Sequence, residues 1–191
     1  VPNVIAVSEK SPYKTLNDLV VDAKKNPGKI NYGSAGNGSA GHLAMEYFSS
    51  EAGIDLVHVP YKGSGPMLTD LIGGQISLSV ETLPAVLPHI KSGKVIPLAS
   101  MTANRIPQLP DLPTVSESGY PGFEGPGWGG VVAPKGTPKA IVEKISSDIR
   151  KVLAKPEVQQ KIIDRGAIVD NRDSTQWSEF VTKEIAKWAE I

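Results

Sequence analysis

Along residues 4–100, short apolar runs alternate with amphipathic segments. Apolar runs of buried-strand length occur at residues 4–7, 30–32, 56–59, 76–80 and 95–100. Between them, apolar residues recur at every third or fourth position, which is the spacing of one face of a helix. Strands that alternate with helices in this way form a mostly parallel sheet with helices on both faces. The pattern therefore predicts the α/β fold class.

Residues with known end preferences bracket the predicted helices. Thr15 is placed to cap a first helix, which the sequence KKNPGK stops. A second helix contains residues 43–48 and ends at Gly53, and a third begins in the sequence GSGP and ends at two glycines. A fourth helix lies in LPAVLPHIKSG, where Gly93 follows its last turn. The predicted helix ends thus fall between the predicted strands.

The composition changes after residue 103. Residues 104–126 are rich in Pro and Gly, which predicts an ordered linker rather than core. A strand is expected at residues 128–132. Three helices follow it, and the residues at their ends are Thr137, Pro138, Pro156, Gly166 and Ser174. Each helix has an apolar stripe, but only one local strand is available to cover, so part of their sheet is expected from elsewhere.

Charge and residue types narrow the function classes. The 191 residues include 20 Lys plus Arg and 20 Asp plus Glu, and this net charge of zero argues against a nucleic-acid surface. The absence of Cys removes thiolate and disulfide chemistry and agrees with an oxidising compartment. No apolar run approaches the roughly 18 residues of a membrane span, and no signal peptide is recognisable. Because the first residue is Val1, the sequence is expected to be a processed or excised piece.

A stretch of Gly, Ser, Ala and Asn joins the second predicted strand to the second predicted helix. It lies in INYGSAGNGSAGHL, residues 30–43, and contains Gly33, Gly36, Gly38 and Gly41. Glycine lets the backbone approach a ligand closely, and the first turn of a helix presents unpaired N–H groups with partial positive charge. The stretch is therefore a candidate anion site. The alternative is tight packing of the helix on the strand, with the serines as N-caps.

Three other motifs share parts of this stretch. Gly36, Gly38 and Gly41 spell GxGxxG, but the next predicted strand ends in VPYKG, without the acidic residue of a dinucleotide site. Ser39 and Ala40 stand where a phosphate loop requires Lys and then Ser or Thr. The sequence NGSAG is one residue from the GxSxG of serine hydrolases, but Ser39 lies several residues past the strand. These readings are therefore less favoured than anion binding.

Polar residues follow two other predicted strands. Glu81 follows one strand, and Tyr61 and Lys62 follow another. Open α/β sheets bind ligands at the carboxyl ends of their strands, so these residues are expected to share a cleft with the Gly/Ser stretch. Trp128 is a candidate apolar wall of that cleft or a core residue. The spacing of the three histidines, at positions 42, 58 and 89, predicts no metal site.

Five segments carry a more specific resemblance. In chain order they are INYGSAGNGSAGHL, VHVPYKGSGPMLTDLIGGQI, LPHIKSGKVIPLA, LPDLPTVSESGYPGFE and APKGTP. This order resembles the Bug family, the TctC-like extracytoplasmic substrate-binding receptors of tripartite tricarboxylate transporters. The resemblance implies a fold like that of type II periplasmic binding proteins, with two α/β lobes that close on a small carboxylate. Residues 8–125 would form one complete lobe, 1–7 and 126–133 the strands crossing between lobes, and 134–191 the C-terminal helical part of the other, incomplete lobe.

The same resemblance assigns candidate ligand-binding residues. They are Ser34, Ala35, Gly36, Gly38, Ser39, Ala40, Tyr61, Lys62, Gly63 and Glu81. Residues of the Gly/Ser stretch would donate hydrogen bonds to one carboxylate, and residues 61–63 would line the cleft. Glu81 would face the variable end of the ligand and favour an amino or hydroxyl group there. The resemblance implies no catalytic residue, cofactor or metal.

The implied function is periplasmic capture of a small carboxylate and its delivery to the membrane components of a tripartite transporter. The carboxylate would be a dicarboxylate, a tricarboxylate, an amino acid or an aromatic acid. A serine-hydrolase-like enzyme and a ligand sensor for a membrane signalling partner are the alternatives. The family's chain begins with about another hundred residues, which include a second Gly-rich loop and have no counterpart here. The sequence is therefore expected to lack that part, or to receive it from a second chain.

Overall fold

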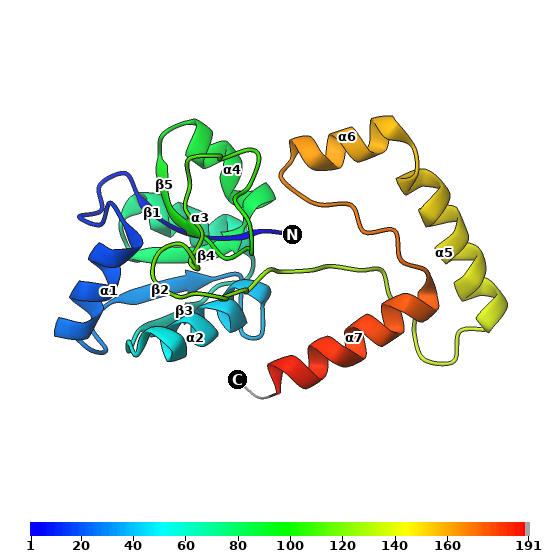
Figure 1. Ribbon diagram of the computed structural model, residues 1–191, viewed down its shortest axis with the longest axis horizontal. Coiled ribbons are helices and arrows are strands. Elements are labelled where there is room, and N and C mark those ends of the chain that lie inside the picture. The colour runs from blue at the N-terminus through cyan, green and yellow to red at the C-terminus, as the bar shows by residue number, and fades with distance from the viewer. Residues whose placement is uncertain (190–191) are drawn as a thin grey trace. The chain divides into compact units, whose positions relative to one another are not determined.

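The computed structural model describes residues 1–189 of the chain (Figure 1). The chain divides into two compact units, Val1–Trp128 and Gly129–Ile191. The first unit contains a sheet and four helices, and the second contains three helices among the residues described. The candidate site residues all belong to the first unit.

A five-stranded sheet forms the centre of the first unit. Its strands are β1 (Asn3–Ser8), β2 (Asn31–Ser34), β3 (Val57–Pro60), β4 (Leu78–Thr82) and β5 (Val95–Ser100), in the spatial order β3-β2-β4-β1-β5. Strand β2 is parallel to β3 and β4, whereas β1 is antiparallel to β4 and β5. The carboxyl ends of β2 to β5 therefore share one edge. The predicted α/β class is confirmed and four of the five strands run in one direction, but the reversed strand β1, which was not predicted, makes the sheet mixed.

Strand β1 accounts for this difference. Its side chains alternate between faces, so Ile5 and Val7 enter one core while Val4 and Ala6 enter the other. A strand buried on both faces has the same apolar pattern in either direction, so the sequence pattern did not show that β1 is reversed. Its direction is seen only in its pairing, where Val4 lies opposite Glu81 of β4.

Helices cover both faces of the sheet, as predicted. Helices α1 (Leu16–Lys25) and α2 (Ala40–Ala52) pack on one face, and α3 (Ser64–Gly73) and α4 (Leu83–Lys91) on the other. Leu19 and Phe48 are fully buried on the first face, and Leu71 and Val86 on the second. These two cores fix the helices that follow β2, β3 and β4 and so position the loops at the carboxyl edge.

Local capping sets the start of the first helix where the sequence predicted it, and a serine caps the second. Thr15 Oγ1 accepts from Asp18 N–H at 3.2 Å, and the Asp18 carboxylate accepts from Thr15 N–H at 2.9 Å. This reciprocal pair is a capping box. At the start of α2, Ser39 Oγ accepts from His42 N–H at 3.3 Å, and Gly53 ends that helix at a φ of 61°.

The Pro- and Gly-rich segment after β5 belongs to the core, which corrects the prediction of a linker. Ile106, Leu112, Val115 and Phe123 of this segment are all buried. The composition showed that regular strands and helices are excluded there, but it did not show that the apolar side chains are exposed. The segment thus closes the sheet's core without regular structure.

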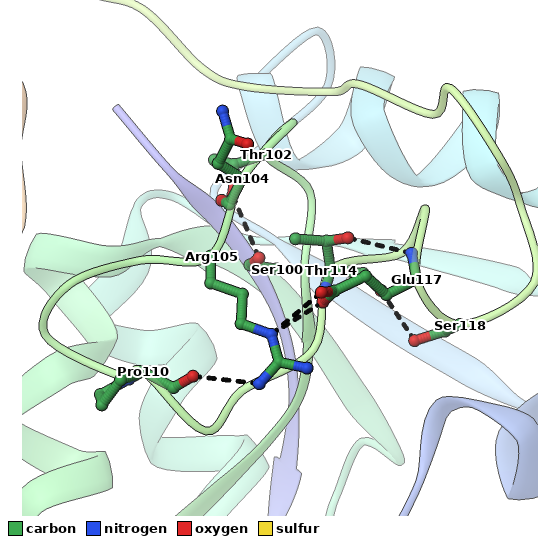
Figure 2. Close-up of polar contacts among 8 residues, drawn as sticks. All are labelled: Ser100, Thr102, Asn104, Arg105, Pro110, Thr114, Glu117 and Ser118. Carbon is green, nitrogen blue, oxygen red and sulfur yellow. Dashed lines mark hydrogen bonds and ion pairs between the residues drawn. The ribbon is translucent and has the colours of Figure 1, made fainter.

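A polar brace holds this segment in place (Figure 2). Arg105 Nε lies 3.0 Å from both carboxylate oxygens of Glu117, and the Arg105 side chain also donates to Pro110 O. The Glu117 carboxylate accepts from Thr114 N–H at 2.9 Å. These hydrogen bonds lower the pKa of Glu117, with the Thr114 N–H as the largest cause and Arg105 next. The brace acts beside backbone hydrogen bonds to β5, in which Ser100 N–H donates to Pro113 O and Val115 N–H donates to Ser100 O.

The second unit contains α5 (Lys139–Leu153), α6 (Pro156–Asp164) and α7 (Ser174–Trp188). The three predicted helices are present, although Pro138 and Asp173, rather than Thr137 and Ser174, are the N-caps of α5 and α7. None of the three helices buries a residue within the described part of the chain.

The strand expected at residues 128–132 is not formed in the described structure. Val131 and Val132 are exposed, because no neighbouring strand pairs with this segment. The assignment of residues 1–7 and 126–133 as crossing strands between lobes stays a prediction. None of the described helices has the length and apolar character needed to cross a membrane.

Candidate anion-binding site

Three loops meet at the carboxyl edge of the sheet. Ser34 at the end of β2 lies opposite Pro60 at the end of β3. Beyond the strands, Tyr61 N–H donates to Ser34 O at 3.1 Å and Gly63 N–H donates to Ala35 O at 3.0 Å. The structure therefore brings together residues 34–36 and 61–63, which lie about 25 positions apart in the sequence. Glu81 lies near the end of β4, at the same edge.

The glycines of the loop serve two different purposes. Gly36 and Gly38 have φ values of 139° and 73°, which residues with a side chain rarely adopt. Gly33 and Gly41 are needed for space, since a Cβ at Gly33 would lie 2.4 Å from the Ile76 side chain and a Cβ at Gly41 2.2 Å from Val80 O. Tight packing and an unusual loop conformation thus both occur, at different positions.

Three helices begin at this edge. The N-caps are Ser39 for α2, Gly63 for α3 and Thr82 for α4, and the last two make no side-chain capping hydrogen bond. Each helix N-terminus carries roughly half a positive charge and directs N–H groups outward. Gly38 and Lys62 are exposed beside these termini. The edge therefore has the electrostatic character that favours an anion.

The Ser34 side chain is engaged within the protein. Its Oγ lies 2.7 Å from His58 Nε2, accepts from Gly36 N–H at 3.2 Å and lies 3.1 Å from Gly36 O. The residue is completely buried. Its hydroxyl group therefore fixes the conformation of the loop at Gly36.

The arrangement does not support serine hydrolysis. Ser39 meets His42 through the backbone N–H, whereas the His42 ring nitrogen Nδ1 accepts from Gly38 N–H. Ser34 does pair with His58, but a hydroxyl with no exposed surface cannot attack a substrate. Among the residues that the structure describes, no group of three His, Cys, Asp or Glu side chains is placed to hold a metal ion.

Tyr61 turns towards α3. Its hydroxyl donates to Asp70 Oδ2 at 2.8 Å, and its ring lies against the site of Gly33. Burial and the hydrogen bond to Asp70 raise the pKa of Tyr61 to about 12. The phenol is therefore neutral at physiological pH, and it packs against one side of the loop. Nearby in the sequence, Gly63 has a positive φ of 103°.

Glu81 is a buried carboxylate with one unpaired oxygen. Its exposed fraction is 5%, and its Oε1 accepts from Thr82 N–H at 2.6 Å and lies 3.0 Å from Thr82 Oγ1. Its Oε2 is buried and has no hydrogen-bond partner within the described structure. An unsatisfied buried acceptor costs about 1–3 kcal/mol, so a donor placed here gains a strong acceptor.

The structure also adds residues that sequence reasoning did not assign. The amide of Asn3 donates to Gly125 O at 2.9 Å and to Ala40 O at 3.4 Å, which fixes the first turn of α2. His42 and His58 contact the loop directly. The contact of His42 with the loop could have been inferred from its position four residues after Gly38. The contact of His58 with Ser34 depends on the pairing of β2 with β3, which the sequence does not show. Trp128 as an apolar wall stays a prediction.

The fold places the chain among periplasmic binding proteins. The structure of the periplasmic binding protein BugD is 37% identical with a TM-score of 0.92, and the match covers 100% of this chain and 64% of that one. An R. palustris protein solved with adipate is also 37% identical, with a TM-score of 0.95 and coverage of 100% and 64%. MatC from Rhodopseudomonas palustris with bound malate is 29% identical, with a TM-score of 0.92 and coverage of 99% and 65%.

Sequence comparison gives the family. The model of the tripartite tricarboxylate transporter family receptor, TctC, matches residues 1–191. BugT of Bordetella pertussis is 35% identical over 193 residues, covering 100% of this chain and 59% of BugT. The chain belongs to the TctC family of receptors, as the sequence motifs predicted. Because the family is one of non-enzymatic solute-binding receptors, the prediction of a non-catalytic protein is confirmed. The chain spans less than two thirds of the length of these relatives.

Proposed function

We propose that this chain provides one half of a binding site for a small carboxylate in a periplasmic receptor. The carboxylate accepts hydrogen bonds from the backbone of residues 35–40 at the start of α2. The observation that carries this proposal is the exposed loop around Gly38, held open by two positive-φ glycines where three helices begin. The oriented N–H groups favour a bound anion by about 0.3–1 kcal/mol, and by up to about 2 kcal/mol in a partly buried site.

Glu81 narrows the class of carboxylate. Its unpaired Oε2 favours a ligand with an amino or hydroxyl group distant from the bound carboxylate. The negative charge of the Glu81 carboxylate disfavours a second carboxylate at that end of the ligand. Hydroxy acids and amino acids are therefore the preferred ligand class.

The family supports a proposal for what the receptor does with its ligand. Delivery of the ligand to the membrane components of a tripartite transporter, from the periplasm, agrees with the family of tripartite tricarboxylate transporter receptors. The mechanism is closure around the ligand, driven by contacts that exist only in the closed state. A second polypeptide segment would supply the other half of the site.

The loop can be tested with a matched pair of glycine variants. Gly38→Ala and Gly53→Ala place a side chain at φ values of 73° and 61°, and neither Cβ meets an atom within 4 Å. Both variants should therefore lose similar stability, of about 1 kcal/mol. Calorimetry with malate, adipate and aspartate should show weakened binding only in Gly38→Ala. Equal binding by the two variants, or no binding of any carboxylate once the segment that supplies the other half of the site is present, would contradict the proposal.

A further inference from the structure

Three aromatic rings stack beside the loop of residues 35–40, which we call the anion loop. His58 of β3 lies between His42 of α2 and Tyr32 of β2, with ring centroids 4.0 Å from His42 and 4.9 Å from Tyr32. The interplanar angles are 25° and 29°. The Tyr32 hydroxyl donates to Glu46 Oε1 of α2. The stack thus joins two strands and the helix that starts at the loop.

Each histidine of the stack holds one of the two positive-φ glycines. Gly38 N–H donates to His42 Nδ1 at 3.1 Å. His58 Nε2 lies 2.7 Å from Ser34 Oγ, which accepts from Gly36 N–H at 3.2 Å. A backbone N–H can only donate, so His42 Nδ1 carries no proton in this arrangement. A neutral His42 therefore occupies the exposed N–H group that a carboxylate would need.

We propose that the His42–His58 pair is a proton-operated clasp on the anion loop. When His42 Nδ1 binds a proton it becomes a donor, and it can no longer accept from Gly38 N–H. Gly38 N–H and the new imidazolium N–H then face an anion together. Carboxylate capture is thereby coupled to uptake of one proton. The ligand half of this inference rests on the proposed function, whereas the clasp itself concerns the free protein.

The groups that face the pair limit the change to one proton. They are the two rings themselves, the Tyr32 phenol from β2 and the Glu46 carboxylate from α2. Burial lowers the pKa of His58, charge on His42 lowers it further, and Glu46 opposes both. Burial and the hydrogen bond to Glu46 raise the pKa of Tyr32. Both shifts favour the neutral forms of His58 and Tyr32.

The clasp can be tested without any ligand. NMR spectra of the full chain, recorded over a range of pH, follow the Gly38 amide and the His42 ring. Both signals should titrate with the same midpoint. The Gly38 titration should vanish in His42→Gln, which keeps an acceptor but has no titrating ring. His89→Gln, at the far end of α4, is the matched control and should leave it unchanged. A Gly38 amide signal that does not change with the protonation of His42 would overturn the proposal.

Proton coupling is tested by calorimetry with adipate and malate. Titration near pH 6.5 in two buffers of different ionisation enthalpy counts the protons bound with each ligand. We expect up to about one proton per ligand, binding about tenfold tighter at pH 5.5 than at pH 8, and neither effect in His42→Gln. Binding without proton uptake would overturn the coupling and leave the proposed function standing. If no carboxylate binds even when the segment that supplies the other half of the site is present, the proposed function fails, and the NMR titration still decides the clasp.

Discussion

At the scale of the residue, the carboxyl edge separates groups that shape the loop from groups that can meet a ligand. The Ser34 hydroxyl and the Tyr61 phenol both bond to the protein itself. Gly38 and Glu81 differ from these groups, because Gly38 N–H donates to the His42 ring at the surface and Glu81 Oε2 is buried without a hydrogen-bond partner in the described structure. We therefore expect ligand specificity to depend on very few groups. Backbone N–H groups of the loop would bind one end of the ligand, and the charge of Glu81 would act on the other end.

Replacing Glu81 tests this division. Glu81→Gln keeps the size of the side chain but removes its negative charge and adds an amide donor. The ratio of affinities for adipate and aspartate should move about tenfold towards adipate, as measured by calorimetry. Glu51→Gln, an exposed carboxylate on α2, serves as the control. An equal change for the two ligands would show that Glu81 does not discriminate between them.

At the scale of the element, irregular structure contributes to the core of the first unit beside the strands and helices. The segment after β5 buries Val115 and Phe123 and is held by the Arg105–Glu117 brace (Figure 2). In the folded protein the pKa of Glu117 lies below its usual range, because the carboxylate accepts from Thr114 N–H and Arg105. A lowered folded pKa contributes stability above the usual carboxyl pKa of about 4.3, and this contribution is lost as the pH falls through the lowered value.

The brace therefore predicts an acid-sensitive contribution to stability. Glu117→Gln should lower the melting temperature at pH 7 and should weaken its fall between about pH 5 and pH 3. Thermal melts over this range, followed by circular dichroism, measure both effects. Asp111→Asn replaces an exposed carboxylate of the same segment and should leave the pH dependence unchanged. A parallel pH dependence in wild type and Glu117→Gln would exclude the brace as its source.

The features that sequence could predict are those set by local chemistry. Thr15, Ser39 and Gly53 set helix ends through their own side chain or φ angle, so their roles were readable in advance. The shared position of the loop and Glu81 followed from the rule that parallel strands end at one edge. The direction of β1 and the ring stack of His58 on Tyr32 depend on strand pairing, which joins distant residues. No local pattern encodes such contacts.

At the scale of the whole molecule, the two units differ in how much apolar surface they bury. The first unit has a core on each face of its sheet. The helices of the second unit bury no residue in the part of the chain described, and Ile141 and Ile185 are exposed. Conformational entropy of roughly 1–2 kcal/mol per residue must be offset by burial. The first unit therefore meets the condition for independent folding, and the second does not.

Separate fragments should behave accordingly. A fragment of residues 1–128 should unfold cooperatively in urea, with a slope of about 1–3 kcal/mol per molar urea. A fragment of residues 129–191 should show no cooperative transition. Circular dichroism and near-ultraviolet fluorescence of the two fragments would measure this difference. Cooperative unfolding of the second fragment would mean that its helices form a core of their own.

The two ends of the first unit lie side by side, because Val1 N donates to Gly127 O at 2.7 Å. Such a unit is a cassette, which a host chain can carry as an insertion without stretching its own backbone. New termini opened in an exposed turn, with the old ends joined by a short peptide, should give a circular permutant with the same fold. The anion loop would then be portable, since every backbone contact that shapes it lies inside the cassette.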